Sequence, residues 1–367
     1  MARSPIARGV VLAVLAAVAF GATTPAIAWA GRGLGPFATA ALLYAGAALA
    51  AAAMQAVSWT LRRVATGHSP VPLRGARLRR GDLPRVVAVA LFGGAIAPSL
   101  LAWGLARAGA VTGSLLLNLE AVFTVLLARA VFREPVGRRV ALAAAAMVAG
   151  GAILVLDTEH GAGAASLAGA LAVAAATLGW AIDNTLTRPL AERDPLDVIA
   201  AKAGLGAAFT AIAARIASEP VPPVGAVLVL ALCGATDYGV SLQLYLLAQR
   251  AIGAARTGSV FALAPFVGAA LAMAIGDRAV TLPTAAAAAL LVAGVYLHLT
   301  ERHAHAHIHD PVDHDHVHRH DDGHHEHVHD PPFAGEHAHP HHHDRLAHSH
   351  DHAPDLHHGH DHEQPSR

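Results

Sequence analysis

Long apolar runs alternate with short polar connections over the first 302 residues of the chain. A helix needs about 20 apolar residues to cross the hydrocarbon core of a bilayer. Ten runs approach that length and contain few charges, which argues against a large soluble helical protein. The pattern therefore predicts ten transmembrane helices, at Gly9–Ala30, Pro36–Val57, Val86–Ala106, Gly109–Ala130, Val140–Leu156, Ser166–Thr187, Val198–Ile216, Val224–Leu247, Ser259–Gly276 and Leu282–Leu299.

The first run has a second interpretation as a cleaved signal peptide. Arg3 and Arg8 precede its apolar core, and Ala28-Trp29-Ala30 resembles a cleavage site. The run is nevertheless long enough to span a bilayer, and the internal repeat described below requires it. We therefore favour a retained helix.

The arginines in the connections predict the orientation of the helices, because cytoplasmic loops carry an excess of positive charge. With the N-terminus in the cytoplasm, seventeen arginines fall on the cytoplasmic side. Four fall on the opposite side, at Arg32, Arg107, Arg215 and Arg278. An even number of crossings returns the C-terminus to the cytoplasm. We therefore expect a multi-pass protein of a bacterial-type inner membrane with both termini cytoplasmic.

The two sets of five runs resemble each other in sequence. Thr112-Gly113-Ser114 recurs as Thr257-Gly258-Ser259, and Gly151 recurs as Gly294. Because five is odd, the second set enters the membrane from the opposite side. Inverted repeats of this kind are typical of secondary transporters, whose substrate site lies near the membrane midplane between the repeats.

Composition divides the chain into an apolar part, residues 1–302, which contains both repeats, and a polar tail, residues 303–367. Only 14% of residues are charged, against roughly 25% in soluble domains. Residues 1–302 contain 23 basic and 13 acidic residues, whereas residues 303–367 contain 3 and 13, so neither part suggests a nucleic-acid partner. The single cysteine, Cys233, allows no disulfide within the chain. We predict an all-α polytopic fold with two inverted five-helix repeats and a disordered tail, at 1–157, 158–301 and 302–367.

Polar side chains inside the runs are functional candidates, because a charge near the bilayer centre is costly. The candidates for transport or coupling are Asn118, Glu120, Asp183, Asn184, Lys202, Asp237, Tyr238 and Gln243. A carboxylate in a low-dielectric interior binds a proton more readily than one in water, so Glu120 is our main candidate for a coupling acid. Structural roles stay open: Glu120 pairs with Lys202 or Arg129, Asp183 neutralises Arg188, and Lys202 extends its ammonium to the interface.

Other polar and aromatic residues of the runs have ordinary structural explanations. Glu134 and Asp277 end their runs, where solvated ion pairs are the expected role. Trp29, Trp103 and Trp180 are expected to be interfacial or packing aromatics. The runs contain no nucleophile–base constellation that would indicate a membrane enzyme.

Histidine dominates the tail, which holds 24 of the 27 histidines of the chain interleaved with acidic residues. Neutral imidazole is a good ligand for zinc, nickel, cobalt and copper. Too few large apolar residues are present to form a core, so we expect a disordered segment that binds divalent metal. The alternatives are an inert extension and a pH-dependent charge switch. The candidate ligands are His303, His305, His307, His309, His314, His316, His318, His320, His324, His325, His327, His329, His341, His342, His343, His357, His358, His360 and His362.

Several segments resemble the EamA-type branch of the drug/metabolite transporter superfamily over residues 1–301. They are Leu119 to Glu134, Trp180 to Arg188 and Gly253 to Ser259, together with Pro265 at a helix-kinking position. The first repeat departs from the pattern, because Glu120 stands about where the corresponding proline is expected. The resemblance implies small-molecule transport by alternating access, mostly efflux, without fixing the substrate.

The sequence therefore predicts a secondary transporter that exports a small metabolite or toxic compound. No Gly-x-x-x-x-Gly-Lys-Ser/Thr motif for ATP is present, so the expected energy source is an ion gradient or exchange. Expected partners are the lipid bilayer, a small-molecule substrate and divalent metal ions, and homodimerisation is left open. Two alternatives remain: a nickel, cobalt or zinc exporter that uses the tail as a collector, and a membrane metal sensor that transports nothing.

Overall fold

The structure is a computed structural model of the 367-residue chain. It describes residues 5–66, 77–133, 136–157, 164–190, 193–252, 254–277, 281–300, 304–309, 312–318, 337–343 and 346–351. The first repeat contains α1 (Pro5–Ala30), α2 (Pro36–Thr66), α3 (Leu83–Val89), α4 (Ala97–Ala108), α5 (Ala110–Leu116), α6 (Leu119–Val131) and α7 (Arg138–Leu156). The second contains α8 (Ala164–Thr187), α9 (Pro195–Ile216), α10 (Val224–Gly234), α11 (Leu242–Ile252), α12 (Ala254–Phe261), α13 (Ala264–Ala274) and α14 (Leu282–Leu299).

Ten helical segments of the described chain are long and apolar enough to cross a membrane, which confirms the predicted all-α fold of ten spans. Each overlaps one predicted run, and the tenth has the predicted bounds, Leu282–Leu299. The largest difference lies in the third span, which begins at Arg80 instead of Val86. The helix there includes the polar residues that precede Val86. A prediction from apolar runs leaves such residues out.

Four spans deviate from regular α-helix at matching places in the two repeats. The third and eighth each contain a π-helical segment, η2 (Ala90–Ile96) and η4 (Ala235–Ser241). The fourth span is interrupted between α5 and α6, and the ninth between α12 and α13. Pro265 accounts for the second interruption, because proline removes a backbone donor. The fourth span breaks without a proline, next to Glu120, which stands where the corresponding proline is expected.

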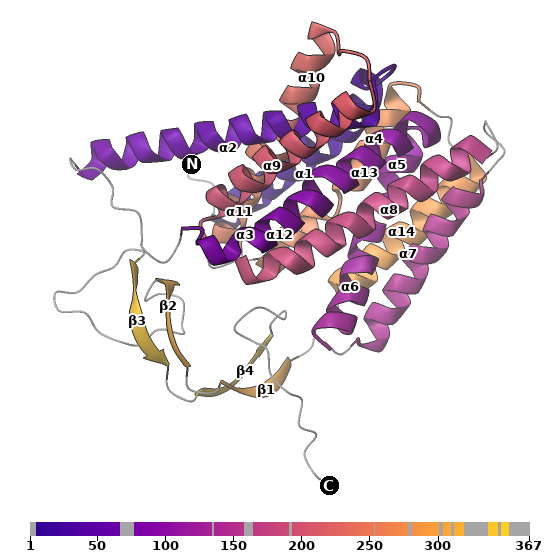
Figure 1. The fold of residues 1–367 in the computed structure, drawn as a ribbon. Helices are drawn as coiled ribbons and strands as arrows, with labels where there is room; N and C mark the ends of the chain where they lie inside the picture. The colour runs from indigo at the N-terminus through magenta and orange to yellow at the C-terminus, as the bar shows by residue number, and fades with distance from the viewer. Residues whose placement is uncertain are drawn as a thin grey trace.

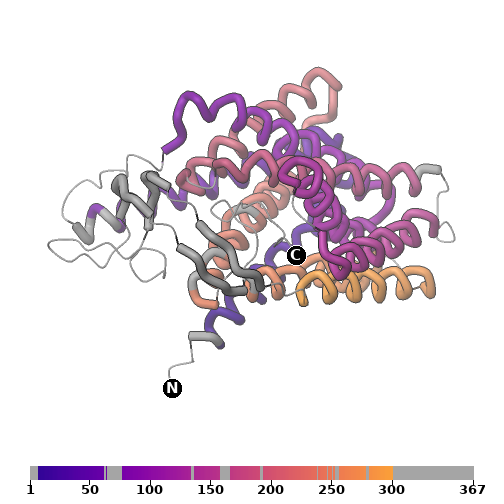
Figure 2. Tube along the Cα trace, turned by 90° about the horizontal axis from the view of Figure 1, so that it is seen from below, coloured from indigo at the N-terminus to yellow at the C-terminus, as the bar shows by residue number. Residues whose placement is uncertain are grey.

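Contacts between helices of the two repeats follow a pseudo-twofold pattern; the helices concerned are labelled in Figure 1. Helix α2 packs along α9, and α7 packs along α14, so each of these pairs joins equivalent spans of the two repeats. Helix α4 of the third span packs against α8, the sixth span. The equivalent contact joins α11 of the eighth span to α1, the first span. Figure 2 shows α14 running beside α7 in a second view. The two repeats are therefore interleaved, and a space between them is bounded by helices of both.

Glycines allow the helices of opposite repeats to approach closely. A methyl group on Gly46 of α2 would overlap the carbonyl oxygen of Ala231 in α10, and one on Gly234 would overlap that of Leu43. The symmetry-related contact joins Gly94 of η2 to Gly206 of α9. In lipid, helix association depends on such close packing, since there is no water to expel.

In the part of the tail that the structure describes, the backbone forms short strands. Four strands are present: β1 (Ala304–His309), β2 (Val312–His318), β3 (His337–His343) and β4 (Leu346–Asp351). Strand β1 pairs with β4 and β2 with β3, both antiparallel. Histidine alternates with other residues in β1 and β2, which matches the two-residue period of a strand. Composition alone does not reveal that period.

Candidate functional site

A cavity of about 510 Å³ lies between the two repeats. Its walls come from α1, α2, α4, α6 and α7 of the first repeat, and from α8, α9, η4, α12, α13 and α14 of the second. Leu117 and Asn118, at the break in the fourth span, and Ala262, at the break in the ninth, all line it. Irregular backbone at membrane depth is tolerated where it borders a cavity, and such breaks commonly contribute to transport sites.

Six of the eight predicted transport residues line this cavity: Asn118, Glu120, Asp183, Asn184, Lys202 and Asp237. They come from four spans that are far apart in the sequence, so the fold collects the polar groups of the apolar runs in one place. The other two residues differ. The side chain of Gln243 is exposed on the helix surface, and that of Tyr238 lies outside the described part of the structure.

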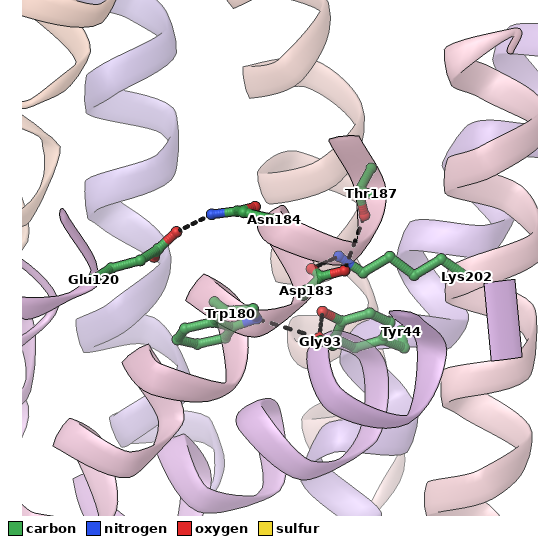
Figure 3. Close-up of polar contacts among 8 residues, drawn as sticks. All are labelled: Tyr44, Gly93, Glu120, Trp180, Asp183, Asn184, Thr187 and Lys202. Carbon is green, nitrogen blue, oxygen red and sulfur yellow. Dashed lines mark hydrogen bonds and ion pairs between the residues drawn. The ribbon is translucent and has the colours of Figure 1, made fainter. Parts of the chain in front are cut away.

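Asp183 of α8 and Lys202 of α9 form an ion pair inside the cavity wall (Figure 3). The Asp183 side chain is 3% exposed and the Lys202 side chain 17%. Thr187 donates a further hydrogen bond to Asp183 at 3.3 Å. Lys202 thus points to a buried carboxylate and not to the membrane interface. Arg188, the partner we considered for Asp183, lies with its guanidinium 4.3 Å above the ring of Phe132.

Glu120 begins α6 directly after the break in the fourth span. Its carboxylate accepts a 2.8 Å hydrogen bond from the side-chain amide of Asn184 in α8 (Figure 3). Of the partners we considered, Lys202 acts on Glu120 electrostatically, as does Asp183. The hydrogen bond to a neutral amide leaves the carboxylate free to exist in either protonation state, as a coupling acid requires.

Asp237 lies in the π-helical segment η4, and its Oδ1 atom is buried without a hydrogen-bond partner among the described residues. The charges of Glu120 and Lys202 both act on it. Ser241, four residues later, donates to the carbonyl of Ala16 at 3.0 Å and thus serves packing. Asp237 and Ser241 therefore differ in role: Asp237 lines the cavity, and Ser241 packs against α1.

A backbone carbonyl of η2 lies beside Asp183 and organises the aromatic side chains of this part of the site. The Gly93 carbonyl accepts hydrogen bonds from the Tyr44 hydroxyl and, at 3.2 Å, from the Trp180 indole (Figure 3). Both aromatic side chains line the cavity. We had assigned Trp180 to the interface or to packing, and we had not singled out Tyr44. The adjacent glycines Gly93 and Gly94 in an apolar run were the available signal for an irregular helix there.

Carboxylates of the second repeat hold helix N-termini of the first repeat at one end of the bundle. Asp277 accepts hydrogen bonds from the backbone N–H groups of Ala110 and Val111, at 2.8 and 3.2 Å. Glu219 accepts from Phe37 and Ala38 at the start of α2. The solvated ion pair that we expected for Asp277 is thus replaced by a helix cap. Its sequence counterpart in the first repeat, Glu134, lies outside the described residues.

The cavity extends toward the other end of the bundle. His298 and Leu299, in the last turn of α14, belong to its lining. The two carboxylate caps lie at the end where α14 begins, because α2, α5 and α14 all start on that side by alternation of the spans. The hydrogen bonds of Asp277 and Glu219 therefore join the repeats at the end where α14 begins. At the other end, the cavity lining reaches the last turn of α14.

The histidines predicted to bind metal fall in the tail, where only some belong to described strands. Strands β1, β2 and β3 contain nine of them: His305, His307, His309, His314, His316, His318, His341, His342 and His343. The others lie outside the described residues: His303, His320, His324, His325, His327, His329, His357, His358, His360 and His362. Among the described residues, no three His, Cys, Asp or Glu side chains are grouped as a metal site.

Comparison with known proteins gives a match to a family model and to individual proteins. The model of the EamA-like transporter family matches residues 7–156 and 167–300. An uncharacterised transporter of Methanothermobacter thermautotrophicus is 27% identical over 232 residues, which cover 60% of this chain and 66% of that protein. A solved structure, described only as the crystal structure of a protein, has a TM-score of 0.55 at 20% identity and covers 80% of this chain and 96% of its own. This last likeness concerns the fold alone.

Proposed function

Because this chain belongs to the EamA-like transporter family, we propose that it is a secondary transporter that exports a small metabolite or toxic compound by alternating access. The family and the transporter relative point to transport and not to an enzyme. The observation that carries the proposal is the cavity, which lies between the repeats and is lined by six of the eight predicted transport residues. Its volume of about 510 Å³ lies within the roughly 300–1,000 Å³ typical of small-molecule sites.

The two ends of the bundle support an alternating-access cycle. At one end, Asp277 and Glu219 join the repeats through hydrogen bonds to helix N-termini. At the other end, Arg193 forms a 2.9 Å ion pair with Asp82, again between the repeats. Each contact must break for its end to open, and each can re-form when the other end opens. Pseudo-twofold repeats favour this exchange, since the two conformations can use equivalent packing.

Coupling to an ion gradient requires a group in the cavity that gains and loses charge. Glu120 has the required place, because it lines the cavity and has a neutral hydrogen-bond partner in Asn184. Replacing Glu120 by Gln preserves that geometry while removing the titratable group. We expect E120Q vesicles to lose the stimulation of transport by a pH gradient and to retain exchange of substrate for substrate. Gradient-driven transport equal to that of the parent would remove Glu120 from the coupling mechanism.

The histidine-rich tail supports a second proposal, in which the chain binds divalent transition metals and collects nickel, cobalt or zinc for export. Its support is the composition: 24 histidines interleaved with 13 acidic residues over residues 303–367. A variant of this proposal is a metal sensor that moves no solute. The excess of arginine on one side of the membrane supports an inner-membrane location with both termini in the cytoplasm, where cytoplasmic metal reaches the tail.

Growth experiments separate these proposals. Cells that lack the protein are challenged with raised nickel, cobalt, zinc and copper and with a panel of toxic organic compounds. They then receive either the full chain or a chain that ends at Arg302. Rescue from an organic compound by both versions supports metabolite export. Rescue from a metal by the full chain alone supports metal export. Failure of both versions to move any solute in vesicles would contradict transport and leave the sensor.

A further inference from the structure

The charges that line the cavity narrow the chemistry of its cargo. Three carboxylates, those of Glu120, Asp183 and Asp237, share the lining with Lys202 and with His298 in the last turn of α14. The ion pair of Asp183 with Lys202 accounts for one carboxylate. Glu120 is hydrogen-bonded to the neutral side chain of Asn184, and Asp237 Oδ1 has no hydrogen-bond partner among the described residues. Acidic groups therefore outnumber the basic groups of the lining.

A negative excess at membrane depth must be balanced, because a buried charge without a partner is costly. In the absence of substrate, protons can neutralise Glu120 and Asp237. A cationic substrate can balance the same charge, whereas an anion would add to the repulsion. Glu120 and Asp237 line the same cavity, so one positive group placed between them is attracted by both.

The remaining walls favour an organic body over a bare metal ion. Phe20 and Phe261 both line the cavity and contact each other edge to face, with ring centroids 5.3 Å apart. Trp180 adds a third aromatic ring. Aromatic faces attract organic cations, while divalent metals prefer several convergent oxygen or imidazole ligands. Among the described residues no group of three such ligands exists.

We propose that the cavity accepts a monovalent organic cation, with its charged nitrogen beside Asp237 and Glu120 and its apolar body against Phe20 and Phe261. This inference rests on the proposed transport function and specifies the class of cargo. It also favours organic export over metal export through the bundle, because the aromatic and apolar walls offer no replacement for the hydration shell of a divalent ion.

The test uses three probes of similar size and different charge with the purified full chain. They are phenyltrimethylammonium, benzamide and benzenesulfonate, measured by calorimetry for binding and by counterflow in proteoliposomes for movement. We expect binding of the cation alone, and a loss of at least about tenfold in its affinity in D237N. The D237E variant, which keeps the charge, retains binding. A matched control, D157N, removes a carboxylate outside the cavity lining and leaves the affinity unchanged.

The readouts distinguish failure of this inference from failure of the proposed function. Binding of benzamide or benzenesulfonate in place of the cation overturns the cargo class, and counterflow of that probe would still support a transporter. An affinity for the cation that is equal in D237N and the parent overturns the role of Asp237, provided that both elute as single species in gel filtration. No binding of the cation to the parent also overturns the inference. Binding without counterflow supports the site and contradicts transport.

Discussion

Individual charged residues show how this membrane-spanning chain accommodates ionisable groups. Asp183 and Lys202 neutralise each other on neighbouring spans, so neither charge is left alone in the low-dielectric interior. Removing one partner of such a pair leaves an uncompensated charge, whereas removing both leaves none. Replacing both residues of the pair should therefore cost less stability than replacing either one alone, which would not hold for an ordinary contact.

We predict that D183N and K202M each destabilise the protein by about 3 kcal/mol, because each leaves one buried charge unpaired. The double variant should be more stable than either single variant. Thermal unfolding of the purified proteins in detergent measures all three. Additive losses in the double variant would mean that the two charges do not compensate each other.

The sequence alone was sufficient to find most of the polar residues of the site. Glu120, Asp183, Lys202 and Asp237 stand out because ionisable side chains are rare in apolar runs. Their partners could not be predicted, since the pairing depends on how the spans pack. Tyr44 was missed for this reason: its role is a hydrogen bond to a carbonyl that belongs to a π-helical segment of another span.

At the scale of helices, the ten spans could be predicted from apolar length, and their irregularities could not. Segments η2 and η4 and the breaks in the fourth and ninth spans lie at membrane depth. Pro265 indicates one of them in the sequence, and the adjacent glycines Gly93 and Gly94 are a weaker signal for η2. The break before Glu120 has no proline; there the Asn118 side-chain amide donates a 2.9 Å hydrogen bond to the Leu115 carbonyl.

Helix contact through Gly46 leads to a prediction about packing between the repeats. In G46A the added methyl overlaps the backbone of α10 at Ala231, so we expect destabilisation of about 1–3 kcal/mol and reduced transport. The matched control is G204A in α9, where an added methyl meets no atom within 4 Å. That variant should change stability by no more than about 0.5 kcal/mol. Equal unfolding temperatures for G46A and G204A would contradict the close contact of α2 with α10.

At the scale of the whole molecule, the account depends on one cavity shared by two inverted repeats. The family match over residues 7–156 and 167–300 covers both repeats, and the helix contacts follow the same pseudo-twofold relation. Repeated motifs such as Thr112–Ser114 and Thr257–Ser259 made this arrangement predictable. The pairing of the tail strands, β1 with β4 and β2 with β3, could not be predicted from composition.

Site-directed labelling of a thiol in the cavity tests this account most directly, and it needs no knowledge of the substrate. The single native cysteine is first removed as C233A, and Thr124, which lines the cavity, is changed to Cys. A control thiol is placed at Leu228, which is 66% exposed on the outer surface of α10. Vesicles of known orientation are then treated with a membrane-impermeant thiol reagent on one side or the other.

Alternating access predicts that the thiol at position 124 reacts from each side in turn and that blocking it from one side abolishes reaction from the other. The thiol at position 228, embedded in lipid, should react from neither side. Reaction of the position-124 thiol from one side only, under every condition of pH gradient tested, would contradict a transporter built around this cavity.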